Sequence, residues 1–465
     1  MSLFVREKSF YKTFFTLTAI IGLQNIITFG VNLSDNLMIG GFSESALSGV
    51  AIANQIQFVL QMLVMGVGEG LVIMASRYWG AKDIESIKKI SSIGMRLSIL
   101  VGLMMWVVVF LFPQVCLSLF TNNESVISEG EKFIKIISFS YFFFSITSIL
   151  LATMRSVETV KIGFILSSTT LIVNVCLNYL LIYGHYGFPK LGVQGAAVAT
   201  LSARIIELII VCIYVKYFDR KIQLKLRDFF KMELPLFKQY LSLGSPILMS
   251  NFIWGLAMGT QTAILGHMGA AAIAANSIAT TVFQIVSVVV FASASATTVV
   301  IGKTIGEGHI DKIKAYAKTL QILYLFVGVF TGILLFFTKD HVLDFYTISS
   351  EARVLALQFM TVLSITVVGT AYQMPSLTGI VRSGGDTKFV LYNDTIFMWL
   401  IVLPASALSA FVFDLSPYII FICLKSDQIL KCFVAIVKVN RFKWIRGFEP
   451  LRPDSKKPGK TIATR

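Results

Sequence analysis

Charged residues are scarce in this chain. Asp, Glu, Lys and Arg make up 14% of its 465 residues, whereas a typical soluble domain carries about 25%. Apolar residues make up 55%, and the mean hydropathy is +0.77. This composition excludes a water-soluble globule and predicts an all-α integral membrane protein. Twelve apolar runs are long enough to cross about 30 Å of hydrocarbon with about 20 residues each; they lie near 14–39, 46–75, 92–112, 133–153, 162–183, 193–216, 240–265, 272–300, 316–337, 353–375, 388–412 and 416–437.

Acidic residues are the scarcer charge type, 25 against 40 basic ones, which leaves a net charge of +15. The distribution of the basic residues argues against nucleic acid as the partner. Most of them fall in alternate loops, while the intervening loops hold little beyond Lys132, Lys190, Lys339 and Arg353. Because cytoplasmic loops of membrane proteins are enriched in Lys and Arg, the pattern predicts a multi-pass protein of the cytoplasmic (inner) membrane with both termini in the cytoplasm.

Residues that commonly carry chemistry are also few. The five cysteines lie almost entirely in apolar runs, which argues against a disulfide framework. The four histidines are far apart and have no metal-ligand spacing. No phosphate-binding loop of the GxxxxGK[ST] type is present, so ATP is not the energy source encoded in this chain. We therefore expect no enzyme activity and no cofactor.

The chain contains an internal repeat. At an offset of 226 residues GAKDIESIKK (80–89) falls on GEGHIDKIKA (306–315), and at 227 RSVETVK (155–161) falls on RSGGDTK (382–388). Each repeat holds six helices, so both halves insert in the same orientation and relate by an axis along the membrane normal, as in transporters with parallel repeats. A duplicated scaffold without transport is the alternative. The predicted organisation is a cytoplasmic N-terminus (1–12), an N-lobe (13–217), a cytoplasmic linker (218–236), a C-lobe (237–437) and a basic cytoplasmic tail (438–465).

Four segments resemble one transporter family, the multidrug and toxic compound extrusion (MATE) family. They are YWGAKD (78–83), NYLLIYGHYGFPKLGVQGAAVAT (178–200), RSGGDTK (382–388) and LKSDQILKCFVAIVKVNRFKW (424–444). The resemblance implies a secondary antiporter that works by alternating access in the bilayer. It would export amphipathic, often cationic, small organic compounds in exchange for H⁺ or Na⁺. We expect a monomer.

Asp35, in GVNLSDNLMIGG (30–41), is the candidate coupling residue. It lies about 21 residues into the first apolar run, roughly 32 Å along a helix and thus in the outer part of the membrane. It could be an aspartate at the interface, solvated from outside. Alternatively it faces the protein interior, where ionisable groups usually mark ion pathways. In the resemblance, the aspartate of the first helix is the cation-coupling residue, and Asp35 matches its local setting.

Polar residues of the 162–183 run offer partners for Asp35. Thr170, Asn174 and Asn178 are spaced i, i+4, i+8 and share one helix face. Amide oxygens around one carboxylate suit Na⁺, which makes Asp35 a possible metal ligand, whereas an isolated carboxylate suits a proton. The asparagines could equally be ordinary interhelical hydrogen-bonding residues. Some family members carry an aspartate in place of Asn178, so the coupling ion stays open. Thr200 matches a cavity residue of the family.

A polar stripe marks the second run. Its members lie within about 120° on a helical wheel; they are Asn54, Gln57, Gln61, Glu69 and Ser76. Within lipid such a stripe must face protein or a wet cavity, so Asn54, Gln57, Gln61 and Glu69 are possible cavity or substrate residues. Glu69 could be a second coupling acid, a contact for a cationic substrate, or the partner of a basic residue such as Arg77.

The other charges within apolar runs are interpreted as structural. Arg204 and Glu207 are three residues apart and can pair, and Lys425, Asp427 and Lys431 form a similar local set. The role of Asp394 stays open. The stretches 250–260 and 369–379 match the region that holds sodium in one branch of the family, but they contain no acid. Coupling is therefore expected in the N-lobe.

Two prolines are hinge candidates, Pro246 and Pro375, since proline frees a backbone carbonyl and allows a bend. They could also be passive kinks.

Two rival functions are weaker. A flippase for lipid-linked saccharides would need a strongly cationic central cavity, yet the basic residues lie mostly in the inner loops. A membrane-embedded enzyme would need a cluster of His, Cys or acidic residues at one depth, and the sequence shows none.

Overall fold

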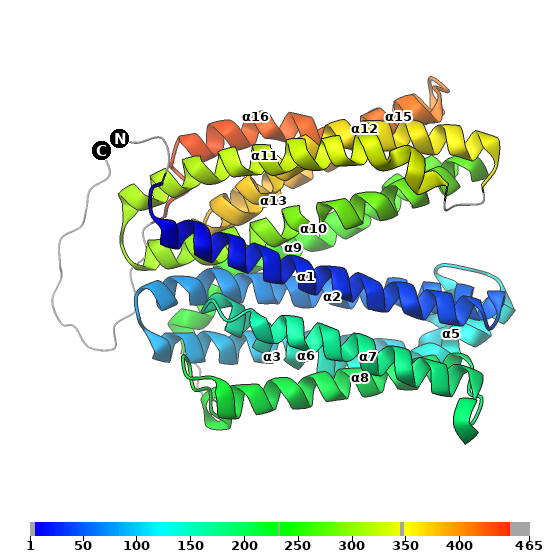
Figure 1. Ribbon diagram of the computed structural model, residues 1–465, viewed down its shortest axis with the longest axis horizontal. Coiled ribbons are helices and arrows are strands. Elements are labelled where there is room, and N and C mark those ends of the chain that lie inside the picture. Colours follow the sequence, from blue (N-terminus) through cyan, green and yellow to red (C-terminus); the bar gives the residue numbers. More distant parts are fainter. Residues whose placement is uncertain (1–4, 231–232, 345–347, 447–465) are drawn as a thin grey trace.

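The computed structural model describes residues 5–230, 233–344 and 348–446, whose regular structure is helical throughout. The first half contains α1 (Lys8–Gly40), α2 (Glu44–Gly80), α3 (Ile84–Leu111), α4 (Pro113–Ser118), α5 (Glu124–Ile137), α6 (Ser140–Ser156), α7 (Lys161–Tyr183) and α8 (Val193–Ile213). The second half contains α9 (Leu234–Gly266), α10 (Ala270–Gly306), α11 (Ile310–Leu343), α12 (Ser350–Met374), α13 (Thr387–Thr395), α14 (Leu403–Phe411), α15 (Pro417–Lys425) and α16 (Asp427–Asn440). The long helices run side by side along the longest dimension of the molecule (Figure 1).

The predicted all-α membrane fold is confirmed. Within the described ranges ten helices are long and apolar enough to cross a membrane, or eleven if the bent pair α5–α6, with an angle of 52°, is one span. The last predicted run is also helical, but it is divided between α15 and α16 and carries three charged residues, Lys425, Asp427 and Lys431. These charges lower its hydropathy, so the twelfth span is less apolar than the others.

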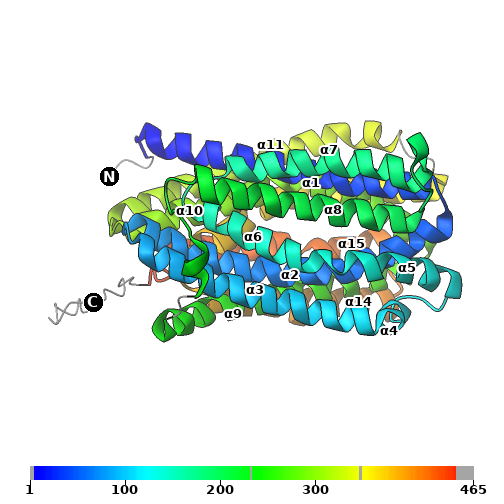
Figure 2. The ribbon, with the colours of Figure 1, turned by 90° about the horizontal axis from the view of Figure 1, so that it is seen from below.

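The helix limits reproduce the internal repeat. Helices α1 and α9 both have 33 residues, and α2 and α10 both have 37. Each helix of the second lobe in these pairs begins 226 residues after its counterpart, as do α11 after α3 and α13 after α7. The chain therefore consists of an N-lobe, α1–α8, and a C-lobe, α9–α16. Figure 2 shows α3, α6, α7 and α8 of the N-lobe lying side by side.

The two lobes meet mainly through α1 and α2 of one and α9 and α10 of the other. Contact is tightest at the end where α1 begins and α16 finishes, on the left of Figure 1, which we call the basic end. There a Cβ added to Gly80 would overlap the carbonyl of Lys303, and one added to Gly306 would overlap the carbonyl of Arg77. Gly80 and Gly306 are counterparts in the repeat, so the interface has the same symmetry as the sequence.

The lobes separate toward the opposite end. A Cβ added at Gly30 of α1, or at Gly255 or Gly259 of α9, would meet no other atom of the described chain within 4 Å. Large apolar side chains of this part of α1 are also uncovered, with Leu33 61% exposed and Leu37 67% exposed. The lobes thus pack closely at the basic end, whereas these faces of α1 and α9 are uncovered toward the other end.

The two predicted hinge prolines lie in different settings. Pro246 is inside α9, which continues through it as one helix. Pro375 begins the π-helical segment η4 (Pro375–Val381), which directly follows α12. Because proline cannot donate the usual backbone hydrogen bond, a widened turn at this point is physically expected. Whether either proline acts as a hinge stays a prediction.

The predicted segment boundaries differ slightly from the helix ends. Helix α1 begins at Lys8, inside the predicted N-terminal segment, and α9 begins at Leu234, inside the predicted linker. Two further short segments are π-helical, η2 (Tyr214–Phe218) and η5 (Ile396–Val402), while η1 (His185–Gly187) and η3 (Leu226–Phe230) are 3₁₀ helices. Most of the predicted tail lies outside the described residues. Its first part folds back, since Trp444 is buried and packs against Gly384.

We expect Gly80→Ala and Gly306→Ala to loosen the basic end, because each added methyl group would collide with a backbone carbonyl of the other lobe. Overpacking of this kind costs about 1–3 kcal/mol. The measurement is the melting temperature of the purified protein in detergent. Gly30→Ala is the matched control, since it adds the same group to a helix facing open space, and equal melting temperatures for all three variants would contradict the described interface.

Candidate functional site

Asp35 is the first member of a chain of side-chain hydrogen bonds that links three helices of the N-lobe. Asn178 of α7 donates to its carboxylate at 2.5 Å and also donates to Asn174 at 3.0 Å. Asn174 in turn donates to the hydroxyl of Thr200 on α8 at 3.2 Å. The spacing of one helical turn between the two asparagines places both amides on the face of α7 that meets α1 and α8. Four residues predicted for one site therefore lie together.

The electrostatic setting of Asp35 is unusual. Its side chain is half-buried and both asparagines are fully buried, yet no Lys or Arg of the described residues lies within ion-pair distance of its carboxylate. The Nδ2 group of Asn178 supplies both of that residue's hydrogen bonds, which leaves its Oδ1 without a partner among the described residues. The site thus offers a carboxylate, amide oxygens and a hydroxyl, the oxygen ligands that hard cations prefer.

A small cavity adjoins this carboxylate. Its volume is about 30 Å³, and it is lined by Asp35, by Asn54 and Gln57 of α2, and by Thr200 and Arg204 of α8, among others. A cavity this size holds about one or two water molecules, whereas pockets for organic ligands measure about 300–1,000 Å³. In this conformation the site can accept a proton or a small ion but not an organic molecule.

A second polar group lies deeper in the N-lobe. Thr170 donates to Glu207 at 2.5 Å, and Arg204 pairs with the same carboxylate at 2.9 Å. Arg204 also lies over the ring of Phe144, 5.1 Å from its centre. The structural pairing expected for Arg204 and Glu207 is therefore present. Thr170 shares a helix face with the two asparagines, but it donates its hydrogen bond to Glu207 and not to Asp35.

Three residues of the predicted polar stripe, Gln61, Glu69 and Ser76, lie away from the cavity that contains Asp35. Gln61 does not line it, and Glu69 forms an ion pair with Arg382 of the C-lobe at 3.2 Å. The suggestion that Arg77 is the partner of Glu69 is wrong, because Arg77 projects across the interface and donates to the carbonyl of Ser383. The sequence could not identify Arg382, which is 313 residues from Glu69.

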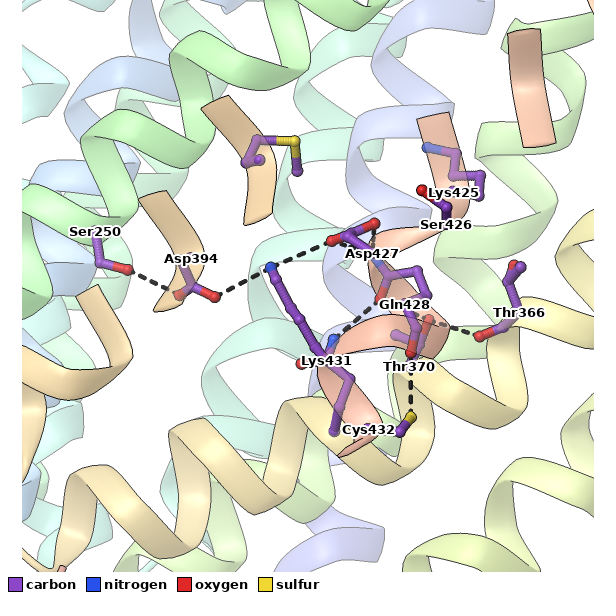
Figure 3. A network of polar contacts seen from close by, with 12 residues as sticks. Ser250, Thr366, Thr370, Asp394, Lys425, Ser426, Asp427, Gln428, Lys431 and Cys432 are labelled. Carbon is purple, nitrogen blue, oxygen red and sulfur yellow. Dashed lines mark hydrogen bonds and ion pairs between the residues drawn. The ribbon is translucent and has the colours of Figure 1, made fainter. Parts of the chain in front are cut away.

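The C-lobe contains a continuous network of charged side chains (Figure 3). Lys431 lies between two carboxylates, 3.1 Å from Asp394 and 3.2 Å from Asp427. Asp394 also accepts from Ser250 at 3.2 Å, with Arg382 3.9 Å away. Of the local set expected on the last helix, Asp427 and Lys431 do pair. Lys425 does not join them in an ion pair and donates instead to Gln261 at 3.2 Å.

This network compensates its own charges. Each buried cation at its centre has carboxylate partners, and burial of an ion in low dielectric is tolerated only with such partners. Asp394, whose role the sequence left open, is thus held by a lysine, a serine and a nearby arginine. Asp35 of the N-lobe has only a neutral hydrogen-bond partner among the described residues, and Arg204, which lines the same cavity, is paired with Glu207. The two lobes therefore share the same arrangement of helices, but the acid in the N-lobe site has no ion-pair partner, whereas the acids of the C-lobe network do.

Two of the polar contacts that join the lobes at the basic end occupy equivalent places in the repeat. Lys303 of the C-lobe pairs with Glu158 of the N-lobe at 2.9 Å. Arg77, the counterpart of Lys303, reaches from the N-lobe to Ser383 of the C-lobe. We call these two contacts the inner latches. In each contact, a cation near the end of α2 or α10 reaches the other lobe. The residue it meets there follows the fourth predicted span of that lobe.

The backbone of Glu158, which pairs with Lys303, has a conformation that is unfavourable for a residue with a side chain. Glu158 has φ 59°, in the left-handed region, and its counterpart Gly385 has φ 90°. Glycine adopts such angles freely, whereas a residue with a side chain is strained there by roughly 1–2 kcal/mol. The ion pair with Lys303 is an interaction that glycine could not make. The sequence alone offers one indication of this feature: when RSVETVK is aligned with RSGGDTK, Glu158 falls on Gly385.

The MatE family model matches residues 21–180 and 246–408 of the chain. The probable multidrug resistance protein NorM of Thermotoga maritima is 24% identical over 423 residues, covering 90% of each chain. The uncharacterized transporter YisQ of Bacillus subtilis is also 24% identical, over 85% of this chain and 87% of that protein. The first name is that of a multidrug resistance protein and the second that of a transporter.

Solved structures share the fold. The Vibrio cholerae MATE transporter VcmN superimposes with a TM-score of 0.85 at 18% identity, covering 93% of this chain and 97% of that chain. An outward-facing multidrug resistance MATE transporter of the MOP superfamily gives a TM-score of 0.84 at 17% identity, covering 92% and 95%.

We expect Lys431→Met to destabilise the protein by about 3–5 kcal/mol, because it leaves the buried Asp427 and the half-buried Asp394 without their shared cation. Lys425→Met is the matched control on the same predicted span, and it should have a smaller effect since no ion pair of the described residues is broken. Thermal unfolding in detergent, followed by circular dichroism, compares the two. A larger loss in Lys425→Met would show that the network is not held by Lys431.

Proposed function

The chain belongs to the MatE family, and on that basis we propose that it is an antiporter that exports amphipathic, cationic organic compounds in exchange for H⁺ or Na⁺. One observation carries the proposal: Asp35 has no counter-ion among the described residues, whereas the carboxylates at the centre of the C-lobe network have theirs. The names of the relatives, multidrug resistance proteins among them, favour this class of cargo.

Asp35 would take up the coupling ion. A carboxylate in a partly buried site is stabilised by any positive charge that reaches it, and either a proton or Na⁺ supplies one. In both cases a turn of the Asn178 amide would bring an acceptor oxygen to the site. A protonated Asp35 donates a hydrogen bond and Na⁺ requires an oxygen ligand, so the free Oδ1 of Asn178 would replace its Nδ2 group. The same oxygen serves either ion.

This turn would transmit ion binding to neighbouring helices. Asn178 now donates to Asn174, and Asn174 to Thr200, so reorientation of the first amide withdraws a donor from the second. Repacking of α1 against α7 and α8 follows as the expected consequence. If it weakens the affinity for cargo, cargo must weaken the affinity for the ion by the same factor, which is the thermodynamic basis of exchange.

Alternating access would require the interface at the basic end to open. Positive-inside bias predicts that this end faces the cytoplasm, so the described arrangement would be the state closed to the cytoplasm. Both inner latches, the Glu69–Arg382 pair and the glycine contact at Gly80 would then separate as cargo is admitted from the cytoplasm or inner leaflet. One apolar cluster also includes side chains of both α2 and α10, such as Ala75 and Ala296, so apolar contacts would have to part together with the polar ones in each cycle.

The central test is transport by inverted membrane vesicles, with dye movement driven separately by a proton gradient and by a Na⁺ gradient. Asp35→Asn should abolish transport driven by the coupling ion, because the amide keeps the shape of the carboxylate but cannot accept a cation's charge. Asp394→Asn is the matched control, since Lys431 keeps Asp427 as a partner, and it should retain ion-driven transport.

Equal ion-driven transport by Asp35→Asn and the parent protein would remove Asp35 from the mechanism. Movement of dye with neither gradient in the parent protein would contradict antiport itself.

The latches are tested by charge exchange. Lys303→Glu places two carboxylates together at the basic end and should shift the protein toward a form open there, while Lys303→Glu combined with Glu158→Lys restores the pair. In a protein without its native cysteines, Ser76→Cys reports the opening, because Ser76 is fully buried against Gly302 of the other lobe. Alkylation should become several-fold faster in the single exchange and return to the parent rate in the double exchange. Equal alkylation in all three proteins would show that the latch does not hold the interface.

A further inference from the structure

A large groove runs along the outer side of the C-lobe, away from the interface between the lobes. Its volume is about 1000 Å³, and it is lined by residues of α11, α12 and α16. Helix α12 packs against both α11 and α16 and forms the floor. The groove is unrelated to Asp35, whose helix belongs to the other lobe.

The body of the groove is apolar and elongated. Its lining on α11 extends from Lys318 to Phe337, about 28 Å at 1.5 Å per residue, which is close to the hydrocarbon thickness of a bilayer. Ile365 on the floor is 63% exposed and Phe337 is 72% exposed. An occupant with long, flexible apolar chains fits such an elongated surface, and a lipid of one leaflet would cover about half of its length.

One end of the groove is polar, and it lies toward the basic end of the molecule. There Gln321 of α11 accepts hydrogen bonds from Tyr372 of α12 at 2.7 Å and from Asn440 of α16 at 3.2 Å. These bonds join the three helices and satisfy the amide oxygen, so this cluster closes the apolar part of the groove at that end.

Cations occur in and beside this polar end. Lys318 lines the groove directly, and Arg441 and Lys443 follow Asn440 in the chain; all three side chains are exposed. None of the three forms an ion pair with another described residue. Lys314, one turn before Lys318, lies 5.9 Å from the ring centre of Phe442, which brings the start of α11 beside the segment that holds Arg441 and Lys443.

We propose that this groove binds one phospholipid with an anionic headgroup, its acyl chains against α11, α12 and α16 and its phosphate at Lys318, Arg441 and Lys443. Basic pockets between transmembrane helices on the cytoplasmic side recognise such headgroups. The three cations disfavour a cationic amphiphile, and a zwitterionic lipid would gain less from them because its net charge is zero. The occupant would come from the leaflet at the basic end.

The test uses the full-length protein in detergent with phosphatidylglycerol or phosphatidylcholine added in equal amounts, and native mass spectrometry to count retained lipids. The parent protein should retain one phosphatidylglycerol in preference to phosphatidylcholine. The triple variant Lys318→Gln, Arg441→Gln, Lys443→Gln should lose this preference, with affinity falling roughly fivefold per charge removed.

A matched triple variant, Lys8→Gln, Lys12→Gln, Lys161→Gln, removes three exposed lysines from the basic end of the N-lobe, and it should bind phosphatidylglycerol as the parent does. Ile365→Trp tests the apolar part independently: it keeps every cation but obstructs the floor, and it should reduce lipid retention and the rise in melting temperature that the lipid produces. Melting temperatures without lipid verify that each variant is folded.

Three results would overturn the proposal. They are equal retention of the two lipids by the parent protein, equal loss of phosphatidylglycerol in both triple variants, and unchanged retention in folded Ile365→Trp.

Discussion

The proposed mechanism depends on one constraint, a half-buried carboxylate that has no ion-pair partner among the described residues. Asp35 is held by the amide of Asn178, and its other surroundings are a small cavity and the polar side chains of α2 and α8. In a membrane interior such a group is tolerated when something positive can reach it. The C-lobe shows the other solution, in which Lys431 between Asp394 and Asp427 supplies the positive charge from within the protein. The central acids of one lobe therefore have ion-pair partners, whereas Asp35 of the other has none within ion-pair distance among the described residues.

The duplicated architecture explains how a local event of this kind could move the whole molecule. Two lobes with matched helix lengths meet at Gly80 and Gly306, and the inner latches sit at equivalent positions of the repeat. The latches are not identical, because Glu158 uses a carboxylate where its counterpart Gly385 has no side chain and the carbonyl of Ser383 serves instead. A few polar contacts of this type can stabilise one relative position of the two lobes without preventing a second one.

Some predictions from the sequence agree with the structure and others do not, and the difference has a physical reason. The spacing of Asn174 and Asn178 placed both on one face, and the structure brings that face to Asp35, because i, i+4 geometry is a property of the helix alone. The same reasoning grouped Thr170 with them, yet Thr170 bonds Glu207, since the identity of the neighbour depends on how α7 and α8 pack. For Glu69 the sequence suggested nearby Arg77, whereas the true partner lies in the other lobe.

The sequence by itself determined the membrane-spanning helices, the repeat and the parallel relation of the lobes. Hydrocarbon obliges each crossing to be a helix of about 20 apolar residues that satisfies its own backbone hydrogen bonds, and this requirement is written locally in the chain. The tertiary structure alone decided which side chains meet across the interface, which acid lacks a counter-ion and where a groove opens on the C-lobe. Those features depend on contacts between positions up to several hundred residues apart, and such contacts leave no periodic mark in the sequence.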